Sequence, residues 1–119
     1  MQPDTLSQQY SNFDVRMTWD IKTIDRKTVI VGAIQNIRYA VMEHIEIWVA
    51  LRDTNGKTVD RAVDFVMPGR LDRDETAAFN VTFPIVVPPG AKLVFTYTYE
   101  GCDGGDGTKW MQSFDSCAP

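Results

Sequence analysis

The chain has 119 residues and a formal net charge of −4, from 12 basic and 16 acidic side chains. This length predicts a single domain, and a content of 44% hydrophobic and 24% charged residues is typical of a globular chain. The acidic balance argues against nucleic acid or an anionic membrane as a partner. No apolar run approaches the roughly 18–20 residues that a membrane-spanning helix needs.

Residues 1–11 are mainly polar and are expected to form a flexible arm ahead of one domain at residues 12–119. The arm lacks the basic and apolar regions of a signal peptide. If the native protein is exported, its signal peptide or lipid anchor has therefore been removed.

Alternation of apolar and polar residues recurs along the chain, and this pattern predicts half-buried strands. It is clearest in residues 13–22, where every odd position is apolar. Residues 28–36 are apolar on both faces, which indicates a central strand, and Gly32 within it indicates a bulge or a close neighbour. The predicted strands lie at residues 13–22, 28–36, 41–53, 57–66, 76–85 and 92–100, with a last strand around 110–114.

Turn signals separate these strands. Asp53-Thr54-Asn55-Gly56 predicts a hairpin turn, because Asn-Gly suits the positive φ angles of tight turns. Pro68-Gly69 and Val87-Pro88-Pro89-Gly90 mark further turns. About seven antiparallel strands with no convincing helix predict an all-β fold, an immunoglobulin-like β-sandwich, with a small barrel as the alternative.

A further pattern runs between residues 32 and 79. Gly32 and Asn36 lie in one predicted strand, and Val49-Ala50-Leu51-Arg52-Asp53 ends the next. The remaining positions of the pattern are Gly56, Leu71, Glu75, Thr76 and Phe79. This pattern resembles the FxLYD family of bacterial and archaeal immunoglobulin-like domains, which occur in secreted or membrane-tethered proteins.

The resemblance covers under half of the chain. Val49, Arg52 and Asp74 stand where the family has phenylalanine, tyrosine and glycine. The resemblance implies a β-sandwich in the cell envelope, and the family has no general activity to carry over to this chain.

Three positions in the same region have expected structural roles. Leu51 is apolar in an alternating strand and is expected in the core. The side chain of Asp53 is expected to cap the turn that follows it. Asn36 is expected to satisfy backbone groups where its strand ends.

Cys102 and Cys117 are the two cysteines. A disulfide between them would enclose about 15 residues, contribute about 3 kcal/mol in the chain-entropy model and indicate an extracytoplasmic location. Two reduced thiols in a cytosolic protein are the alternative. A hairpin centred on Gly104-Gly105 would place Cys102 near Gly107, so Cys117 would reach it only if the loop folds back.

The sequence offers little catalytic chemistry. His44 is the single histidine, and a solvated histidine at a strand end is the simplest interpretation. No His/Cys cluster has zinc spacing, so we expect no enzyme and no cofactor. Asp103 and Asp106, on a glycine-rich loop, suit calcium and predict, as the alternative function, a calcium- or carbohydrate-binding sandwich.

Trp48 differs from the other two tryptophans, because Trp19 and Trp110 fall on the inward sides of their strands. Trp48 lies with Glu46 and Arg52 on the expected solvent side of a strand, where a tryptophan beside a guanidinium suits a protein partner or stacks on it. We therefore predict a non-enzymatic interaction or spacer module of a bacterial cell-envelope protein.

Overall fold

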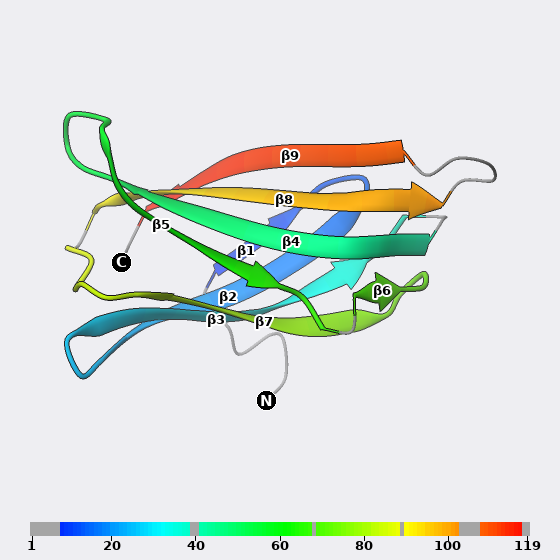
Figure 1. The fold of residues 1–119 in the computed structure, drawn as a ribbon, viewed down its shortest axis with the longest axis horizontal. Helices are drawn as coiled ribbons and strands as arrows, with labels where there is room; N and C mark the ends of the chain where they lie inside the picture. The colour runs from blue at the N-terminus through cyan, green and yellow to red at the C-terminus, as the bar shows by residue number, and fades with distance from the viewer. Residues whose placement is uncertain (1–7, 39–40, 68, 89, 103–107, 118–119) are drawn as a thin grey trace.

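Nine strands form the described part of the chain, which comprises residues 8–38, 41–67, 69–88, 90–102 and 108–117 of a computed structural model. The strands pack as two layers (Figure 1). Their bounds are β1 Gln8–Ser11, β2 Val15–Ile24, β3 Lys27–Asn36, β4 Val41–Arg52, β5 Thr58–Phe65, β6 Arg70–Leu71, β7 Thr76–Phe83, β8 Lys92–Cys102 and β9 Thr108–Cys117.

The two layers are antiparallel sheets. One has the order β1-β2-β3-β7, and the other has the order β5-β4-β8-β9, with the short β6 paired to β4. The seven predicted strands correspond to the seven long strands. Residues Gln8–Ser11 correct the expectation of a loose arm over residues 1–11, because they form β1 and pair with β2 from Gln8↔Trp19 to Ser11↔Arg16.

The core lies between the sheets and follows the predicted alternation. In β7 every second residue is buried, from Ala77 to Phe83, and in β4 the buried set includes Leu51, which is 2% exposed. The largest buried side chains are aromatic or long aliphatic: Trp19, Tyr97, Tyr99, Phe83, Phe95, Met17, Ile30 and Ile34. Burial of this apolar surface is the main favourable contribution to folding.

Gly32 lies where three strands approach closely. It is paired with Trp19 of β2 on one side and with Phe79 of β7 on the other. A Cβ atom at this position would lie 2.7 Å from Cζ of Phe79 and 2.8 Å from Cβ of Trp19. The glycine therefore makes room for two buried aromatic residues, as the expectation of a close neighbour anticipated.

Two polar side chains have the structural roles expected from the sequence. Oδ1 of Asp53 accepts hydrogen bonds from the backbone N–H groups of Asn55 and Lys57 at 2.9 and 3.0 Å, so it caps the turn. Asn36 is fully buried; its Nδ2 donates to the carbonyl of Leu71 at 2.9 Å, and its Oδ1 accepts from the N–H of Arg38 at 3.0 Å. Asn36 thereby links the end of β3 to β6.

The predicted disulfide between Cys102 and Cys117 is wrong. In the β8–β9 hairpin, Gly101 pairs with Thr108 and Lys92 pairs with Cys117, so the two cysteines lie at opposite ends of the hairpin. Ten residues of extended strand span about 33 Å, whereas a disulfide requires Cα atoms roughly 4.4–6.8 Å apart. Cys117 is a free, exposed thiol, and the cysteines no longer argue for an oxidising compartment.

Candidate interaction surface

The outer face of the β5-β4-β8-β9 sheet brings together side chains from four strands. Strand register sets this arrangement, because residues paired across neighbouring strands point to the same face. Trp48 lies between Val63 of β5 and Thr96 of β8. Ala50, the next outward residue of β4, lies between Arg61 and Val94.

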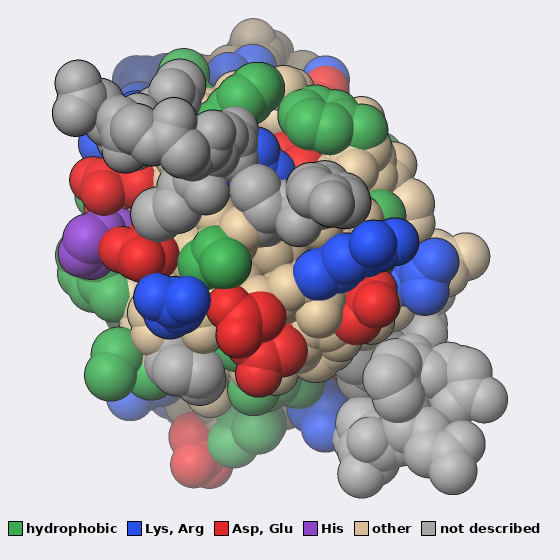
Figure 2. Space-filling view, turned by 90° about the vertical axis from the view of Figure 1, so that its right-hand side faces the viewer, with side chains coloured by type: hydrophobic (Ala, Val, Ile, Leu, Met, Phe, Trp, Pro, Cys, Tyr) green, Lys and Arg blue, Asp and Glu red, His purple; other side chains and the backbone are tan. Residues whose placement is uncertain are grey.

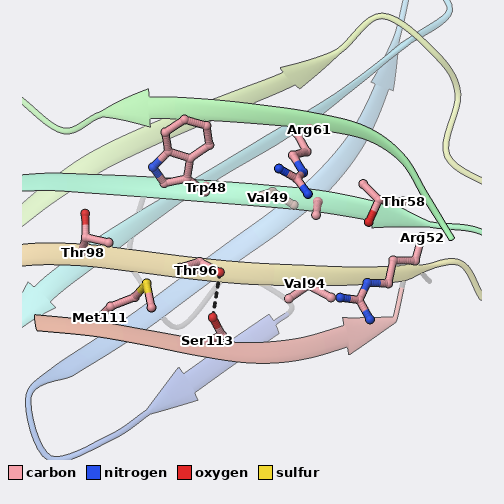
Figure 3. Close-up of a pocket in the computed structure, with 11 residues that line it drawn as sticks. Trp48, Val49, Arg52, Thr58, Arg61, Val94, Thr96, Thr98, Met111 and Ser113 are labelled. Atoms are coloured by element: carbon pink, nitrogen blue, oxygen red, sulfur yellow. Dashed lines mark hydrogen bonds between the residues drawn. The ribbon is translucent and has the colours of Figure 1, made fainter. Parts of the chain in front are cut away.

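A groove of about 500 Å³ follows this face across all four strands (Figure 3). Its walls are apolar and hydroxyl side chains with two arginines. The lining residues are Trp48, Val49, Ala50, Arg52, Thr58, Arg61, Val94, Thr96, Thr98, Met111 and Ser113. Trp48 and Met111 lie towards one end and Arg52 towards the other, with Arg61 between them on the β5 side.

Trp48 presents its ring to solvent at the apolar end of the groove. The side chain is 39% exposed, and its indole Nε1–H donates a hydrogen bond of 3.1 Å to Oε1 of Glu46. The predicted residues Trp48, Arg52 and Glu46 are thus on one face. The hydrogen bond of the indole is to Glu46, whereas the sequence suggested a contact between the indole and Arg52. Met111, 67% exposed, adds a second apolar side chain from the edge strand β9.

Arg52 and Arg61 carry the positive charge of the groove. Neither guanidinium forms an ion pair or a hydrogen bond within the described residues, and Nε of Arg52 is buried there without a hydrogen-bond partner. No Asp or Glu is among the described residues that line the groove. A buried N–H group without a partner is unfavourable, so this arrangement leaves Arg52 with unsatisfied hydrogen-bonding capacity.

Arg61 and Met111 are site residues that the sequence reasoning missed. For Met111 the signal was present, because the assignment of Trp110, Gln112 and Phe114 to one face of the last strand places Met111 on the other. Arg61 lies in the return strand with the less regular pattern, and only its pairing with Ala50 places it on the groove.

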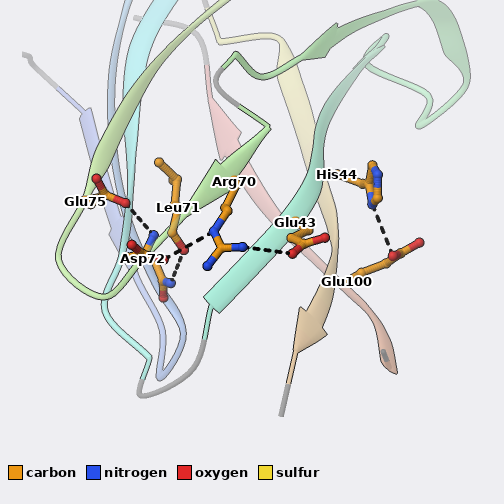
Figure 4. Close-up of polar contacts among 8 residues, drawn as sticks. Glu43, His44, Arg70, Leu71, Asp72, Glu75 and Glu100 are labelled. Atoms are coloured by element: carbon orange, nitrogen blue, oxygen red, sulfur yellow. Dashed lines mark hydrogen bonds and ion pairs between the residues drawn. The ribbon is translucent and has the colours of Figure 1, made fainter. Parts of the chain in front are cut away.

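The end of the sandwich at which β4 begins has charges of both signs (Figure 2). His44 lies there in a β-bulge, with φ of 53°, and its Nδ1 lies 3.1 Å from Oε2 of Glu100. Arg70 lies between Glu43 and Asp72, at 3.6 and 3.5 Å (Figure 4). The His44 side chain is 72% exposed, so the simple interpretation of a solvated histidine agrees with its position.

The predicted metal residues Asp103 and Asp106 lie outside the described residues, so the calcium or carbohydrate site stays a prediction. In the part of the chain that the structure describes, no group of three or more His, Cys, Asp or Glu side chains is placed to hold a metal ion. The same part contains no helix long and apolar enough to cross a membrane.

Two packed antiparallel sheets define an immunoglobulin-like β-sandwich, and solved structures share this fold. The GAE domain of GGA2p from Saccharomyces cerevisiae superposes with a TM-score of 0.68 and 8% identity, over 94% of this chain and 96% of that one. The yeast GGA1 GAE domain has a TM-score of 0.57 and 14% identity, over 92% and 96% of the two chains. The predicted fold class is thereby confirmed.

The yjhA protein from Bacillus subtilis is similar at a TM-score of 0.50 and 16% identity, over 79% of this chain and 78% of that one. At these identities the likeness concerns the fold alone. No protein-family model matches the chain, and no curated protein sequence matches it.

Proposed function

We propose that this protein is a non-enzymatic interaction module whose groove binds an extended segment of another protein bearing carboxylate and apolar side chains. The observation that carries the proposal is that Arg52 and Arg61 lie in one groove where, among the described residues, their guanidinium groups have no partner and the lining holds no carboxylate. The chain as a whole has a net charge of −4, so the positive charge of the groove contrasts with the overall charge of the protein.

The chemistry of the lining selects the occupant. Arginine binds carboxylates through short, charge-assisted and often bidentate hydrogen bonds. Trp48 and Met111 offer exposed apolar surface at the other end of the same groove. Tryptophan and arginine are also the residues most enriched among those that dominate binding energy at protein interfaces. A segment with acidic residues at one end and an aromatic or aliphatic residue at the other fits both ends.

The cell-envelope setting and membership of the FxLYD family are part of this proposal. Asp74, which occupies the family's glycine position, has φ of 70°, a conformation that glycine adopts readily and other residues rarely do. The backbone at this position therefore suits the glycine of the family pattern. An exported, extracytoplasmic module, lipid-anchored in its precursor, would present the groove to partners in the envelope.

Selection of peptides tests the groove directly. The full chain is immobilised and presented with a phage library of random peptides, and the affinities of enriched peptides are measured by fluorescence anisotropy. We expect enriched sequences to combine Asp or Glu with an aromatic or aliphatic residue. The double variant Arg52→Gln/Arg61→Gln should bind these peptides roughly tenfold or more weakly, because two charge-assisted contacts are lost.

Arg16→Gln is the matched control, since Arg16 is an exposed arginine on the opposite sheet. It should leave peptide affinity unchanged. Enrichment of no peptide would contradict the proposal in favour of a spacer role. Equal affinity of folded wild type and the Arg52→Gln/Arg61→Gln variant would show that peptides bind elsewhere.

A further inference from the structure

Strand β9 is a long and regular sheet edge. It spans ten residues, Thr108–Cys117, pairs with β8 on one side only and contains no proline. Its pairing with β8 has no register shift, whereas the pairings of β4 with β5 and with β8 each contain one. A long edge strand with regular backbone geometry presents unpaired N–H and C=O groups to another strand.

The other edges of the two sheets are shorter or covered. β1 has four residues. β5 and β7 lie side by side where the two sheets meet (Figure 1), and Oδ2 of Asp64 accepts a hydrogen bond of 2.8 Å from the N–H of Asn80. On the β9 side, Tyr10 of β1 stacks on the ring of Phe114 at 3.8 Å between ring centroids, inside the sandwich.

The sequence of β9 is complementary to itself when two copies pair antiparallel about a two-fold axis at Gln112. In that register Lys109 lies opposite Asp115 of the second copy, and the symmetry repeats the pair. Lys109 is exposed. Asp115 forms an ion pair of 3.1 Å with Lys92 of its own chain, and its side chain is 57% exposed, so its carboxylate can accept Lys109 of the second copy as an additional partner across the new interface. On the inner face, Trp110 lies opposite Phe114 of the second copy.

Neighbouring registers lack this complementarity. A two-fold axis at Ser113 would place Lys109 opposite Cys117 and Met111 opposite Asp115, so the charge pairs are lost. A shift by a single residue would pair outer-face residues of one β9 with inner-face residues of the other, so the two sandwiches would lie on opposite sides of the joined sheet. Opposite charges and aromatic pairs across strands each contribute roughly 0.2–1 kcal/mol, so the Gln112-centred register is favoured over the others.

We propose that β9 pairs antiparallel with β9 of a second copy of this chain, joining the two β5-β4-β8-β9 sheets into one continuous sheet. Met111 and Ser113, which line the groove, then lie opposite Ser113 and Met111 of the second copy. Each groove therefore gains the exposed methionine of the other copy as an extension of its apolar end. The idea that the second copy extends the binding groove rests on the proposed function of the groove. The proposal that β9 forms a dimer is independent of that function.

Charge exchange in the full chain tests the register. Sedimentation velocity over a wide concentration range should show a monomer–dimer equilibrium for the wild type. Lys109→Asp and Asp115→Lys should each weaken the dimer about tenfold or more, because two like-charge pairs replace two opposite-charge pairs. The double variant Lys109→Asp/Asp115→Lys should restore the dimer, since the acidic side chain at position 109 then faces the basic one at position 115 of the other copy.

Lys27→Asp is the matched control, because it makes the same charge change on an exposed residue of the other sheet. It should leave dimerisation unchanged, and thermal unfolding should show that every variant is folded. A wild type that stays monomeric at all concentrations, or a double variant no more dimeric than the single ones, would overturn the proposal. Arg52→Gln/Arg61→Gln should weaken peptide binding but leave dimerisation unchanged, which separates the two proposals.

Discussion

The hydroxyl of Tyr97 in β8 donates a hydrogen bond of 2.8 Å to Oδ1 of Asp14, 83 positions earlier in the chain. Oδ2 of the same carboxylate accepts a second bond, of 2.7 Å, from Tyr99. Asp14 and Tyr97 are fully buried and Tyr99 is 1% exposed. A buried charge is tolerated only when it is paired or hydrogen-bonded, so the two phenols hold the segment before β2 against the opposite sheet.

Alkaline pH should weaken the fold through Tyr97. Burial raises the pKa of Tyr97 above its ordinary value of 10.0, and the hydrogen bond to Asp14 raises it further, while a bond with Asn12 acts in the opposite direction. Below pH 10 the folded and unfolded states both hold the proton, so the full stability is present. Above pH 10 the Tyr97 hydroxyl loses its proton in the unfolded state but keeps it in the folded state. The free energy of unfolding therefore falls by up to about 1.4 kcal/mol per pH unit.

Urea unfolding followed by tryptophan fluorescence between pH 8 and pH 11 measures this effect. Tyr97→Phe is the comparison, because it removes the ionisable group and keeps the ring. Its unfolding free energy should be lower than that of the wild type at pH 8 and should fall less steeply above pH 10. Identical slopes for the two proteins would show that other groups cause the alkaline loss.

Gly32→Ala should destabilise the protein by about 3 kcal/mol or more, which is the range of severe overpacking. The added Cβ would meet Trp19, Phe79 and the carbonyl of Thr18 at distances that these atoms must relieve by moving. Gly69→Ala is the control, since a Cβ there has its nearest neighbour, the carbonyl of Val66, at 3.8 Å. Chemical unfolding should show a large loss of unfolding free energy for Gly32→Ala and not for Gly69→Ala. If the two variants had similar stabilities, β3 and its neighbours would be able to move enough to accommodate the added Cβ.

Local alternation predicted the long strands because a half-buried strand needs side chains of opposite character on its two faces. It placed Leu51 in the core and Trp48 outside, and their exposed fractions of 2% and 39% confirm both placements. It missed β1, because Gln8–Ser11 is polar and becomes a strand only by pairing with β2. Such pairing depends on residues outside the segment itself, so the local sequence pattern of Gln8–Ser11 does not predict it.

The groove could be predicted only in part for the same reason. Trp48, Glu46 and Arg52 belong to one strand, so their common face follows from alternation. Arg61 reaches the groove through the register of β5 on β4. The prediction of a disulfide was wrong for the same reason, because it depended on strand register. The regular pairing of β8 with β9 places Cys117 at the far end of the hairpin from Cys102.

Cys117 should react as a free thiol in the folded protein. It is exposed at the end of β9 and has no disulfide. Iodoacetamide added without reductant should therefore alkylate Cys117, as peptide mapping by mass spectrometry would show. Cys117→Ser should change the free energy of unfolding by less than about 0.5 kcal/mol, the usual range for surface substitutions. Protection of Cys117 until a reductant is added would instead indicate a disulfide.

Leu51→Ala and Trp48→Ala should separate stability from binding, because the two residues lie on opposite faces of β4. Leu51 is 2% exposed in the core, and its truncation should reduce the free energy of unfolding by roughly 2–5 kcal/mol. Phe95→Ala, fully buried in β8, should fall in the same range.

Trp48 is 39% exposed and donates its indole hydrogen bond to the neighbouring Glu46 on the surface. Its replacement by alanine should therefore reduce stability by about 1 kcal/mol or less, while peptide affinity falls about tenfold or more. Urea unfolding and fluorescence anisotropy on the same samples measure both quantities. A collapse of stability in Trp48→Ala would show that the tryptophan supports the sheet, whereas unchanged affinity in a stable variant would remove it from the binding site.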